Sequence, residues 1–322
     1  MVAGVTSEFC LRLKDNGHAD KYTLQKMRRI KSGKLWIHLD EDNIESVDWL
    51  KNESGVDELV VENLLDEETQ PRFFTLPNGT FVVLRDMNLN RNADIEDMIA
   101  VRIWIEKNRI ISLSHRRQPA IEKLVDSFSK GNTPLTPAGV FIRLAENITL
   151  NISKVLNKID DGLDDIEDEL IDVDTLGADA LRYRISDIRH QVLGMRRYIG
   201  PQRDVFISLK TLEPELTKEE RAVLRAIRRD MLQAVSSLDY AREHSTVSQE
   251  ELDSRINVQL NKTMYVFTII MVVLAPLTLI TGILGSNSIE VTENPYGFIL
   301  ISLSLIVLGF LQVWYFKRKR WF

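Results

Sequence analysis

The sequence predicts an α+β domain followed by long helices and a two-helix transmembrane hairpin. Three observations support this fold class. Strand-like and helical segments alternate before residue 138, and residues 138–262 are patterned as helix. Residues 263–289 and 294–316 contain no Asp, Glu, Lys, Arg or His. Because a membrane-spanning helix needs about 20 predominantly apolar residues, both C-terminal runs are long enough to span a bilayer.

The composition excludes some classes of protein. The chain has 322 residues, one cysteine and a formal net charge of -6. A single cysteine (Cys10) cannot form an internal disulfide, so a disulfide-stapled secreted protein is excluded. The negative charge argues against nucleic acid as the main partner. Residues 1–16 have no apolar stretch typical of a cleavable signal peptide, so we expect none.

The first domain, residues 1–137, contains the strand-like runs. They cover residues 34–39, 80–84, 99–106 and 109–114, and turn residues such as Pro77-Asn78-Gly79 separate them. Residues 56–65 and 119–130 are patterned as helices between the strands. The proline-containing segment 131–137 is typical of a linker.

Residues 138–262 form the second predicted domain and continue into the membrane segments. Three long helices are expected at residues 138–174, 178–212 and 217–284, with breaks at 175–177 and at Glu213-Pro214. Thr217 followed by Glu220 is a capping box, which predicts the start of the third helix. No proline lies between residues 215 and 275, so that helix can run unbroken into the membrane. Helices of this length require partner helices.

Residues 263–322 form the third domain, with spans predicted at 264–284 and 296–316. The segment between them carries Glu290 and Glu293 and no basic residue, whereas residues 317–320 are Lys-Arg-Lys-Arg. Basic segments stay on the cytoplasmic side, so both termini should be cytoplasmic in an inner (cytoplasmic) membrane. Trp314, Tyr315 and Trp321 fall where an interfacial aromatic belt is expected.

One face of the first span is polar or small. At about 100° per residue, the residues of this stripe fall within about 40° of one line. They are Met264, Thr268, Met271, Ala275, Thr278 and Gly282, continued towards the N-terminus by Asn257, Asp253 and Glu250. Such a face suits close helix packing or the lining of a pore, and packing is the commoner use. The continuation into acidic residues favours a pore, because acidic rings attract cations.

The first span ends in Gly285-Ser286-Asn287. A ring of Asn287 amides at the outer mouth could hold the water shell of a hydrated divalent cation, which such ions lose reluctantly. Glu290 and Glu293 would concentrate cations there. The alternative is a plain helix C-cap followed by a solvated loop, since Gly and Asn are also favoured at caps.

Residues 267–287 (FTIIMVVLAPLTLITGILGSN) are similar to the pore helix and Gly-x-Asn signature of the CorA superfamily of divalent-cation transporters. The chain resembles most closely the ZntB branch of that superfamily. The resemblance extends over nearly the whole chain. It is carried further by Trp36-Ile37-His38-Leu39, Pro71-Arg72, Leu84-Arg85, Arg196-Arg197-Tyr198, Pro201-Gln202-Arg203-Asp204 and the Arg320-Trp321-Phe322 end.

The resemblance implies a funnel-shaped homopentamer that takes up divalent cations through a central pore. By family motif Asn287 would form the outer selectivity ring. Thr278 and Met264 would line the pore, and Glu250 and Asp253 would lie near the cytoplasmic mouth, where a regulatory metal could bind. Zinc is the expected cargo, with a magnesium, cobalt or nickel channel as the alternative.

The sequence departs from the family pattern at the outer mouth. Ser286 stands where the family usually has an apolar residue, and residues 288–295 replace the Gly-Gly-Ile-Pro-Gly loop of the ZntB type. The loop departure weakens the case for a zinc preference. A membrane-anchored helical scaffold or sensor that conducts nothing is the alternative from another functional class.

Other candidate sites give weaker signals. Nine carboxylates lie between residues 160 and 174, and we expect them to form a solvated helix face opposite Arg182, Arg184 and Arg189 rather than a metal sensor. The carboxylates are Asp160, Asp161, Asp164, Asp165, Glu167, Asp168, Glu169, Asp172 and Asp174. The scattered histidines have no paired metal-ligand spacing, so no tight inner-sphere metal site is predicted. His38 should be structural.

Catalytic and nucleotide-binding signatures are absent from the sequence. It has no Walker A sequence, no G-x-S-x-G and no Rossmann fingerprint. We therefore expect no enzyme activity and no cofactor beyond the transported ion. Transport would be driven by the membrane potential or by a proton gradient.

Overall fold

The computed structural model describes residues 8–14, 18–27, 33–67, 70–90, 94, 96–131, 134–171, 177–286 and 295–319. The chain forms two compact units. The first comprises Met1–Asp172 and Asp179–Gln249, and the second comprises Val173–Ala178 and Glu250–Phe322.

A seven-stranded mixed sheet organises the first unit. The strand order is β2-β1-β3-β7-β6-β5-β4. Only β3 and β7 pair in parallel, and the other neighbours are antiparallel. The strands are β1 (Phe9–Leu13), β2 (Ala19–Tyr22), β3 (Lys34–Asp40), β4 (Arg72–Leu76), β5 (Gly79–Asp86), β6 (Ile99–Ile105) and β7 (Arg109–Ser114). The four predicted strands are β3, β5, β6 and β7, which confirms an α+β domain.

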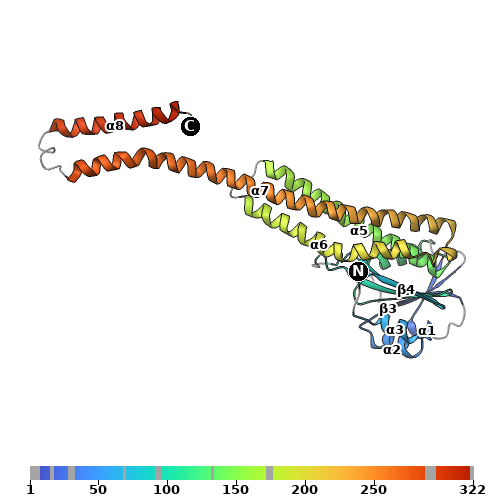
Figure 1. Cartoon of the computed structure of the whole chain (residues 1–322). Helices are drawn as coiled ribbons and strands as arrows, with labels where there is room; N and C mark the ends of the chain where they lie inside the picture. The colour runs from blue at the N-terminus through green and yellow to red at the C-terminus, as the bar shows by residue number, and fades with distance from the viewer. Residues whose placement is uncertain are drawn as a thin grey trace. The chain divides into compact units, whose positions relative to one another are not determined.

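Each face of the sheet has its own core because side chains alternate along a strand. Phe81 and Val83 of β5 pack in a smaller cluster with Trp49 and Leu64. These partners come from α2 (Ile44–Asn52) and α3 (Glu58–Leu64), which cover one face (Figure 1). A further short helix is α1 (Leu24–Met27).

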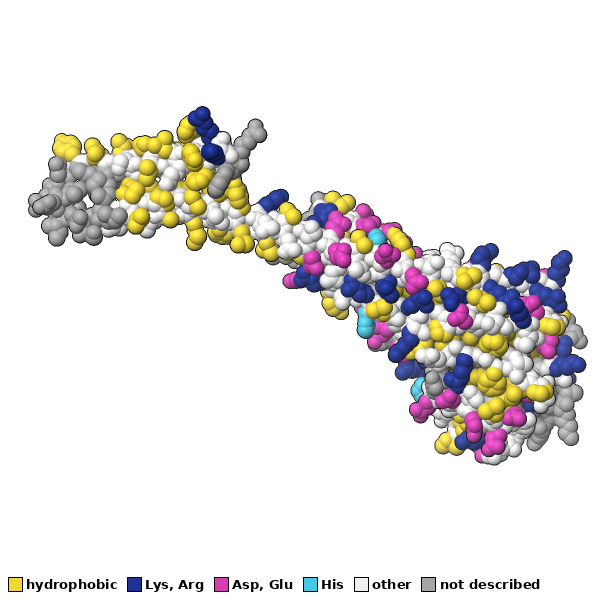
Figure 2. All heavy atoms as spheres, viewed as in Figure 1, with side chains coloured by type: hydrophobic (Ala, Val, Ile, Leu, Met, Phe, Trp, Pro, Cys, Tyr) yellow, Lys and Arg dark blue, Asp and Glu magenta, His cyan; other side chains and the backbone are white. Residues whose placement is uncertain are grey.

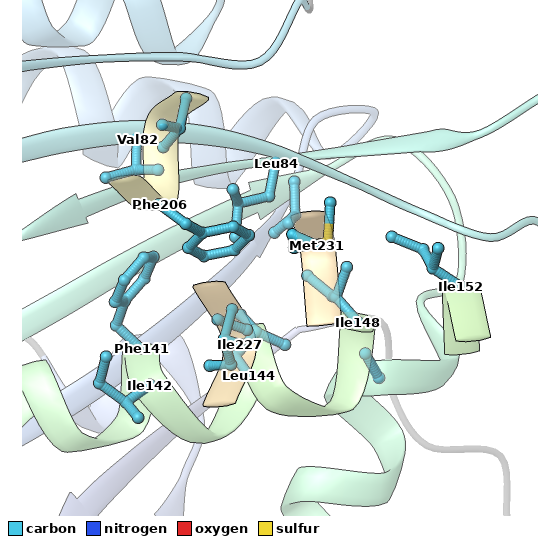
Figure 3. Close-up of a cluster of buried hydrophobic side chains, with 14 of the residues drawn as sticks. Val82, Leu84, Phe141, Ile142, Leu144, Ile148, Ile152, Phe206, Ile227 and Met231 are labelled. Carbon is cyan, nitrogen blue, oxygen red and sulfur yellow. The ribbon is translucent and has the colours of Figure 1, made fainter. Parts of the chain in front are cut away.

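The opposite face of the sheet packs against helices in a larger cluster. Val82 and Leu84 of β5 meet Phe141 of α5 (Pro137–Ile171), Phe206 of α6 (Ala178–Ser208) and Met231 of α7 (Lys218–Ser286), as Figure 3 shows. Helix α4 (Pro119–Ser129) joins the same core. The long helices are thus anchored on the sheet by buried apolar side chains.

The break before α7 has the predicted cap. A 3-10 turn, η1 (Glu213–Glu215), separates α6 from α7. The Thr217 backbone N–H donates to Glu220 Oε2 at 2.9 Å, and the Glu220 N–H donates to Thr217 Oγ1 at 3.2 Å. These reciprocal hydrogen bonds confirm the capping box.

The second unit contains the C-terminal part of α7 and the helix α8 (Pro295–Arg318). By length and composition, one helix among the described residues could cross a membrane, and it is the Lys218–Gly282 part of α7. The second predicted span coincides with α8 and stays a prediction.

Candidate cation pathway

The predicted stripe lies along one exposed face of α7. Met264 is 66% exposed and Met271 is 72% exposed. Thr268, Ala275, Thr278 and Gly282 are exposed as well, and a Cβ added at Gly282 would meet nothing within 4 Å. No element among the described residues of the chain therefore covers this face.

Helix α8 covers the opposite face of α7. The less exposed residues of the α7 span are Ile269, Val273, Pro276, Leu277 and Ile280. At about 100° per residue they lie about 120° to 220° around the helix from Met264. Leu277 contacts α8 directly, beside Gly309. The stripe consequently points away from α8, so packing within the hairpin does not explain its small and polar residues.

Charge is distributed unevenly around α7. Glu250 and Asp253 belong to the stripe, where Glu250 is exposed and Asp253 is half-buried. The basic residues Arg255 and Lys262 fall about 160° to 180° from the stripe, and Arg255 pairs with Glu251 at 2.6 Å. The face that would line a pathway is therefore acidic at its N-terminal end and otherwise neutral, which favours cations over anions.

The threonines of the stripe present oxygen lone pairs. Thr268 Oγ1 donates to the Met264 carbonyl at 2.8 Å, and Thr278 Oγ1 donates to the Leu274 carbonyl at 2.9 Å. Since each hydroxyl hydrogen is used within the helix, the free lone pairs of the hydroxyl oxygen remain as acceptors. Such oxygens can contact a cation or the water around it.

Most of the predicted outer mouth lies outside the described residues. This holds for Asn287, Glu290 and Glu293. Gly285 and Ser286 are the last two residues of α7, so the helix extends to the start of the Gly-x-Asn signature.

The acidic run near the end of α5 faces partners on two other helices. Glu169 pairs with Arg184 at 2.5 Å, and Glu167 lies 2.8 Å from His244 Nε2. Burial, and then the charges of Asp164 and Asp161, raise the pKa of Asp160.

Arg184 is the expected arginine for which a pair with this run is described, and the other two also have partners elsewhere. Arg182 pairs with Asp179 at 3.7 Å, and Arg189 hydrogen-bonds the Ser245 carbonyl at 3.3 Å. No group of three or more potential metal ligands occurs among the described residues.

His38 is a structural histidine. Its Nδ1 lies 2.9 Å from Ser112 Oγ, which also accepts a hydrogen bond from Trp36 Nε1 at 2.9 Å. Burial lowers the pKa of His38 to about 4, so it is neutral at physiological pH. Cys10 is buried in the sheet, and burial raises the pKa of its thiol to about 12.

The buried amide of Gln312 and a groove between α7 and α8 are two features that the sequence pattern does not predict. Gln312 on α8 has a buried side-chain oxygen without a partner among the described residues. It lies with Val272 and Pro276 in a groove between α7 and α8. The sequence feature that could have pointed to Gln312 is the presence of an amide side chain within the apolar run 294–316.

Comparisons with known proteins agree over nearly the whole chain. The family model described as CorA-like Mg2+ transporter protein matches residues 31–318. The divalent cation transporter CmaX of Pseudomonas aeruginosa is 32% identical over 291 residues, covering 89% of this chain and 87% of the relative. The zinc transport protein ZntB of Pectobacterium carotovorum is 31% identical over 290 residues, with the same coverage.

Solved structures share the fold. The structure of full-length CmaX matches with a TM-score of 0.80 and 28% identity, covering 99% of this chain and 100% of that one. The CorA magnesium transporter from Methanocaldococcus jannaschii also gives a TM-score of 0.80, with the same coverage at 21% identity. The family match, the full-length similarity and the exposed polar stripe of α7 lead to one conclusion: the chain belongs to the CorA family of divalent-cation transporters and is not an enzyme.

Proposed function

We propose that this protein takes up zinc across the cytoplasmic membrane through a central pore lined by α7. The observation that carries the proposal is the orientation of the stripe, which faces away from α8 and has no covering element within the described chain. A single helix face cannot enclose an aqueous path, so the pore requires several copies around an axis. We propose the homopentamer that the family resemblance implies.

The proposed topology has two spans, α7 and α8, with both termini in the cytoplasm. The basic end of α8, with Lys317, Arg318 and Lys319, supports this orientation. The soluble domains 1–137 and 138–262 would then face the cytoplasm, and Glu250 and Asp253 would form the inner mouth. Asn287 would form the outer selectivity ring, with Glu290 and Glu293 outside it.

Zinc is proposed as the cargo because a relative named as a zinc transport protein is 31% identical over 89% of this chain. Neither run of residues 263–289 or 294–316 contains an ionisable acid, base or histidine. Protons, if coupled to uptake, would therefore be carried at Glu250, Asp253, Glu290 or Glu293 rather than within the spans.

Metal flux into liposomes containing the purified full-length protein tests the proposal. Zinc and magnesium are compared, each with and without an inward proton gradient. We expect zinc flux that rises with the gradient. Magnesium flux that follows voltage alone would show that the cargo is magnesium rather than zinc and that transport is not coupled to protons.

Two threonines provide a matched pair for the pore. Thr278 lies on the stripe, whereas Thr281 lies about 100° away from the stripe's centre line. Both are exposed, and both hydroxyls donate to the carbonyl four residues earlier, at 2.9 and 3.0 Å. We expect Thr278→Leu to abolish flux and Thr281→Leu to retain most of it. Equal loss in both variants would overturn the assignment of the stripe as the pore lining.

A further inference from the structure

A groove of about 480 Å³ lies between α7 and α8. Val272 and Pro276 of α7 and Leu308 and Leu311 of α8 line it, so its walls are mainly apolar. Leu311 is 54% exposed and Trp314 at the groove is 56% exposed. The groove is thus an accessible apolar surface on the hairpin, and Figure 2 shows many hydrophobic side chains on the described part of that hairpin.

Two residues that line the groove have polar groups without their usual partners. Pro276 has no N–H, so the Val272 carbonyl loses its usual helical partner. The amide of Gln312 lines the same groove, and its oxygen has no partner among the described residues. Unsatisfied polar groups are costly in hydrocarbon, but the Gln312 oxygen is itself buried, so the apolar walls and the charge beside the groove define its occupant.

The end of α8 next to the groove is strongly basic. The Arg318 guanidinium lies over the Trp314 ring, 5.3 Å from its centroid, which fixes a cation beside the groove. Lys317 and Lys319 are its exposed neighbours. No Asp or Glu occurs in residues 295–322 to neutralise them. The groove therefore combines apolar walls with a positive rim.

We propose that this groove binds one anionic phospholipid. An acyl chain would lie along Val272, Leu308 and Leu311, and the phosphate would contact Arg318. Apolar walls match the chain, and basic residues at the end of a span match an anionic headgroup. The choice of leaflet rests on the topology proposed above, which makes this the cytoplasmic leaflet. Binding itself requires no cation transport.

Quenching of Trp314 fluorescence by brominated lipids tests the proposal. The full-length protein carries Trp321→Phe, so that Trp314 is the only tryptophan of the hairpin. It is reconstituted in phosphatidylcholine vesicles containing brominated phosphatidylglycerol or brominated phosphatidylcholine. We expect about fivefold tighter association for the anionic lipid, the factor expected for one basic residue near the membrane surface. Inorganic phosphate should not relieve the quenching.

Matched variants separate a bound lipid from general surface charge. Arg318→Gln and Lys319→Gln each remove one positive charge, but only Arg318 stacks on Trp314 among the described contacts. We expect Arg318→Gln to abolish the preference and Lys319→Gln to retain it. Leu308→Phe, which fills the groove without changing charge, should lower quenching by the anionic lipid. All variants are first checked for the same elution volume as the parent.

Three results would overturn the proposal. Equal quenching by both lipids would show that the groove has no headgroup preference. An equal loss of the preference for anionic lipid in Arg318→Gln and Lys319→Gln would show that the preference comes from general surface charge. Absence of quenching by either lipid would mean that a second copy of the chain covers the groove. None of these results depends on metal flux, so failure here leaves the transport proposal standing.

Discussion

Gly309 of α8 lies against Leu277 of α7, and a Cβ placed on Gly309 would be 3.7 Å from Leu277 Cδ1. Leu277 therefore faces the partner helix. Its neighbour Thr278 is turned about 100° further around α7 and lies on the exposed stripe. This contact determines which face of α7 is left for a pathway. Small residues at such positions allow two membrane helices to approach closely.

Enlarging residue 309 should separate the two helices. Alanine fits, because 3.7 Å is an ordinary van der Waals contact. Leucine does not fit without displacing Leu277, so we expect Gly309→Leu to lower the free energy of unfolding by about 1–3 kcal/mol. Thermal unfolding in detergent measures this, with Gly309→Ala as the control. Equal stability of the two variants would show that α8 does not pack closely at this position.

Asp86 is a fully buried carboxylate that joins the sheet to α4 and α5. It accepts hydrogen bonds from the Met87 N–H at 2.8 Å, the Ala120 N–H at 3.2 Å and Asn151 Nδ2 at 3.1 Å. Burial nevertheless dominates and raises the pKa of Asp86 to about 6.

This raised pKa makes stability depend on pH in a defined direction. The contribution of protonated Asp86 to the stability of the folded state is fully present below the unfolded pKa of 3.8, and it is lost as the pH rises through the folded pKa of about 6. A shift of about two units corresponds to a loss of about 3 kcal/mol. We therefore expect the free energy of unfolding of Asp86→Asn, measured relative to that of the parent, to increase as the pH rises from 4 to 8.

The comparison of parent and Asp86→Asn isolates this group. His38, whose pKa is lowered to about 4, changes stability in the opposite direction, but it is present in both proteins. The measurement is thermal or urea unfolding of the full chain in detergent at several pH values. A stability difference that does not change with pH would show that Asp86 keeps an ordinary pKa.

The sequence predicted the long helices and four strands because their signals are local. Helical periodicity, Thr217 with Glu220, and Pro214 place α5, α6 and α7 within a few residues of their observed ends, except that α6 ends at Ser208. Strands β1, β2 and β4 were missed. In β2 (ADKY), for example, few apolar residues alternate, and pairing with β1 forms the strand.

The candidate pathway, too, could be predicted from sequence only where its signals are local. The stripe from Glu250 to Gly282 follows from helix geometry alone, because its residues repeat on one face. Which face α8 covers depends on contacts such as Leu277 with Gly309, and no local pattern encodes them. The same holds for Gln312, whose buried amide is apparent only after the two helices pack.

Removing the capping hydroxyl should weaken the start of α7. Thr217→Ala loses the hydrogen bond from the Glu220 N–H to Thr217 Oγ1. We expect a loss of about 1 kcal/mol in the free energy of unfolding, whereas Thr217→Ser should cost less because serine can cap in the same way. Denaturant unfolding of the full chain measures both. Identical stability of the alanine and serine variants would mean that the cap contributes little.

Gln202 of α6 continues the hydrogen bonding of β5 beyond the end of β4. The last pair between β4 and β5 is Arg72 with Val83. Two residues further along, the Arg85 N–H donates to Gln202 Oε1 at 2.6 Å, and Gln202 Nε2 donates to the Arg85 carbonyl at 3.2 Å. The Gln202 side chain is fully buried, and the Arg85 guanidinium lies 4.3 Å from the centroid of the Tyr198 ring.

Gln202→Leu should therefore destabilise the first unit strongly. The substitution keeps a side chain of similar size but removes both hydrogen bonds of Gln202 with the Arg85 backbone, at a cost of about 3 kcal/mol. The control is Gln191→Leu on the same helix, where the amide donates to the exposed Asp187 at 2.9 Å. It should change the free energy of unfolding by no more than about 0.5 kcal/mol. If both variants unfold at the same denaturant concentration as the parent, Gln202 does not join α6 to the sheet.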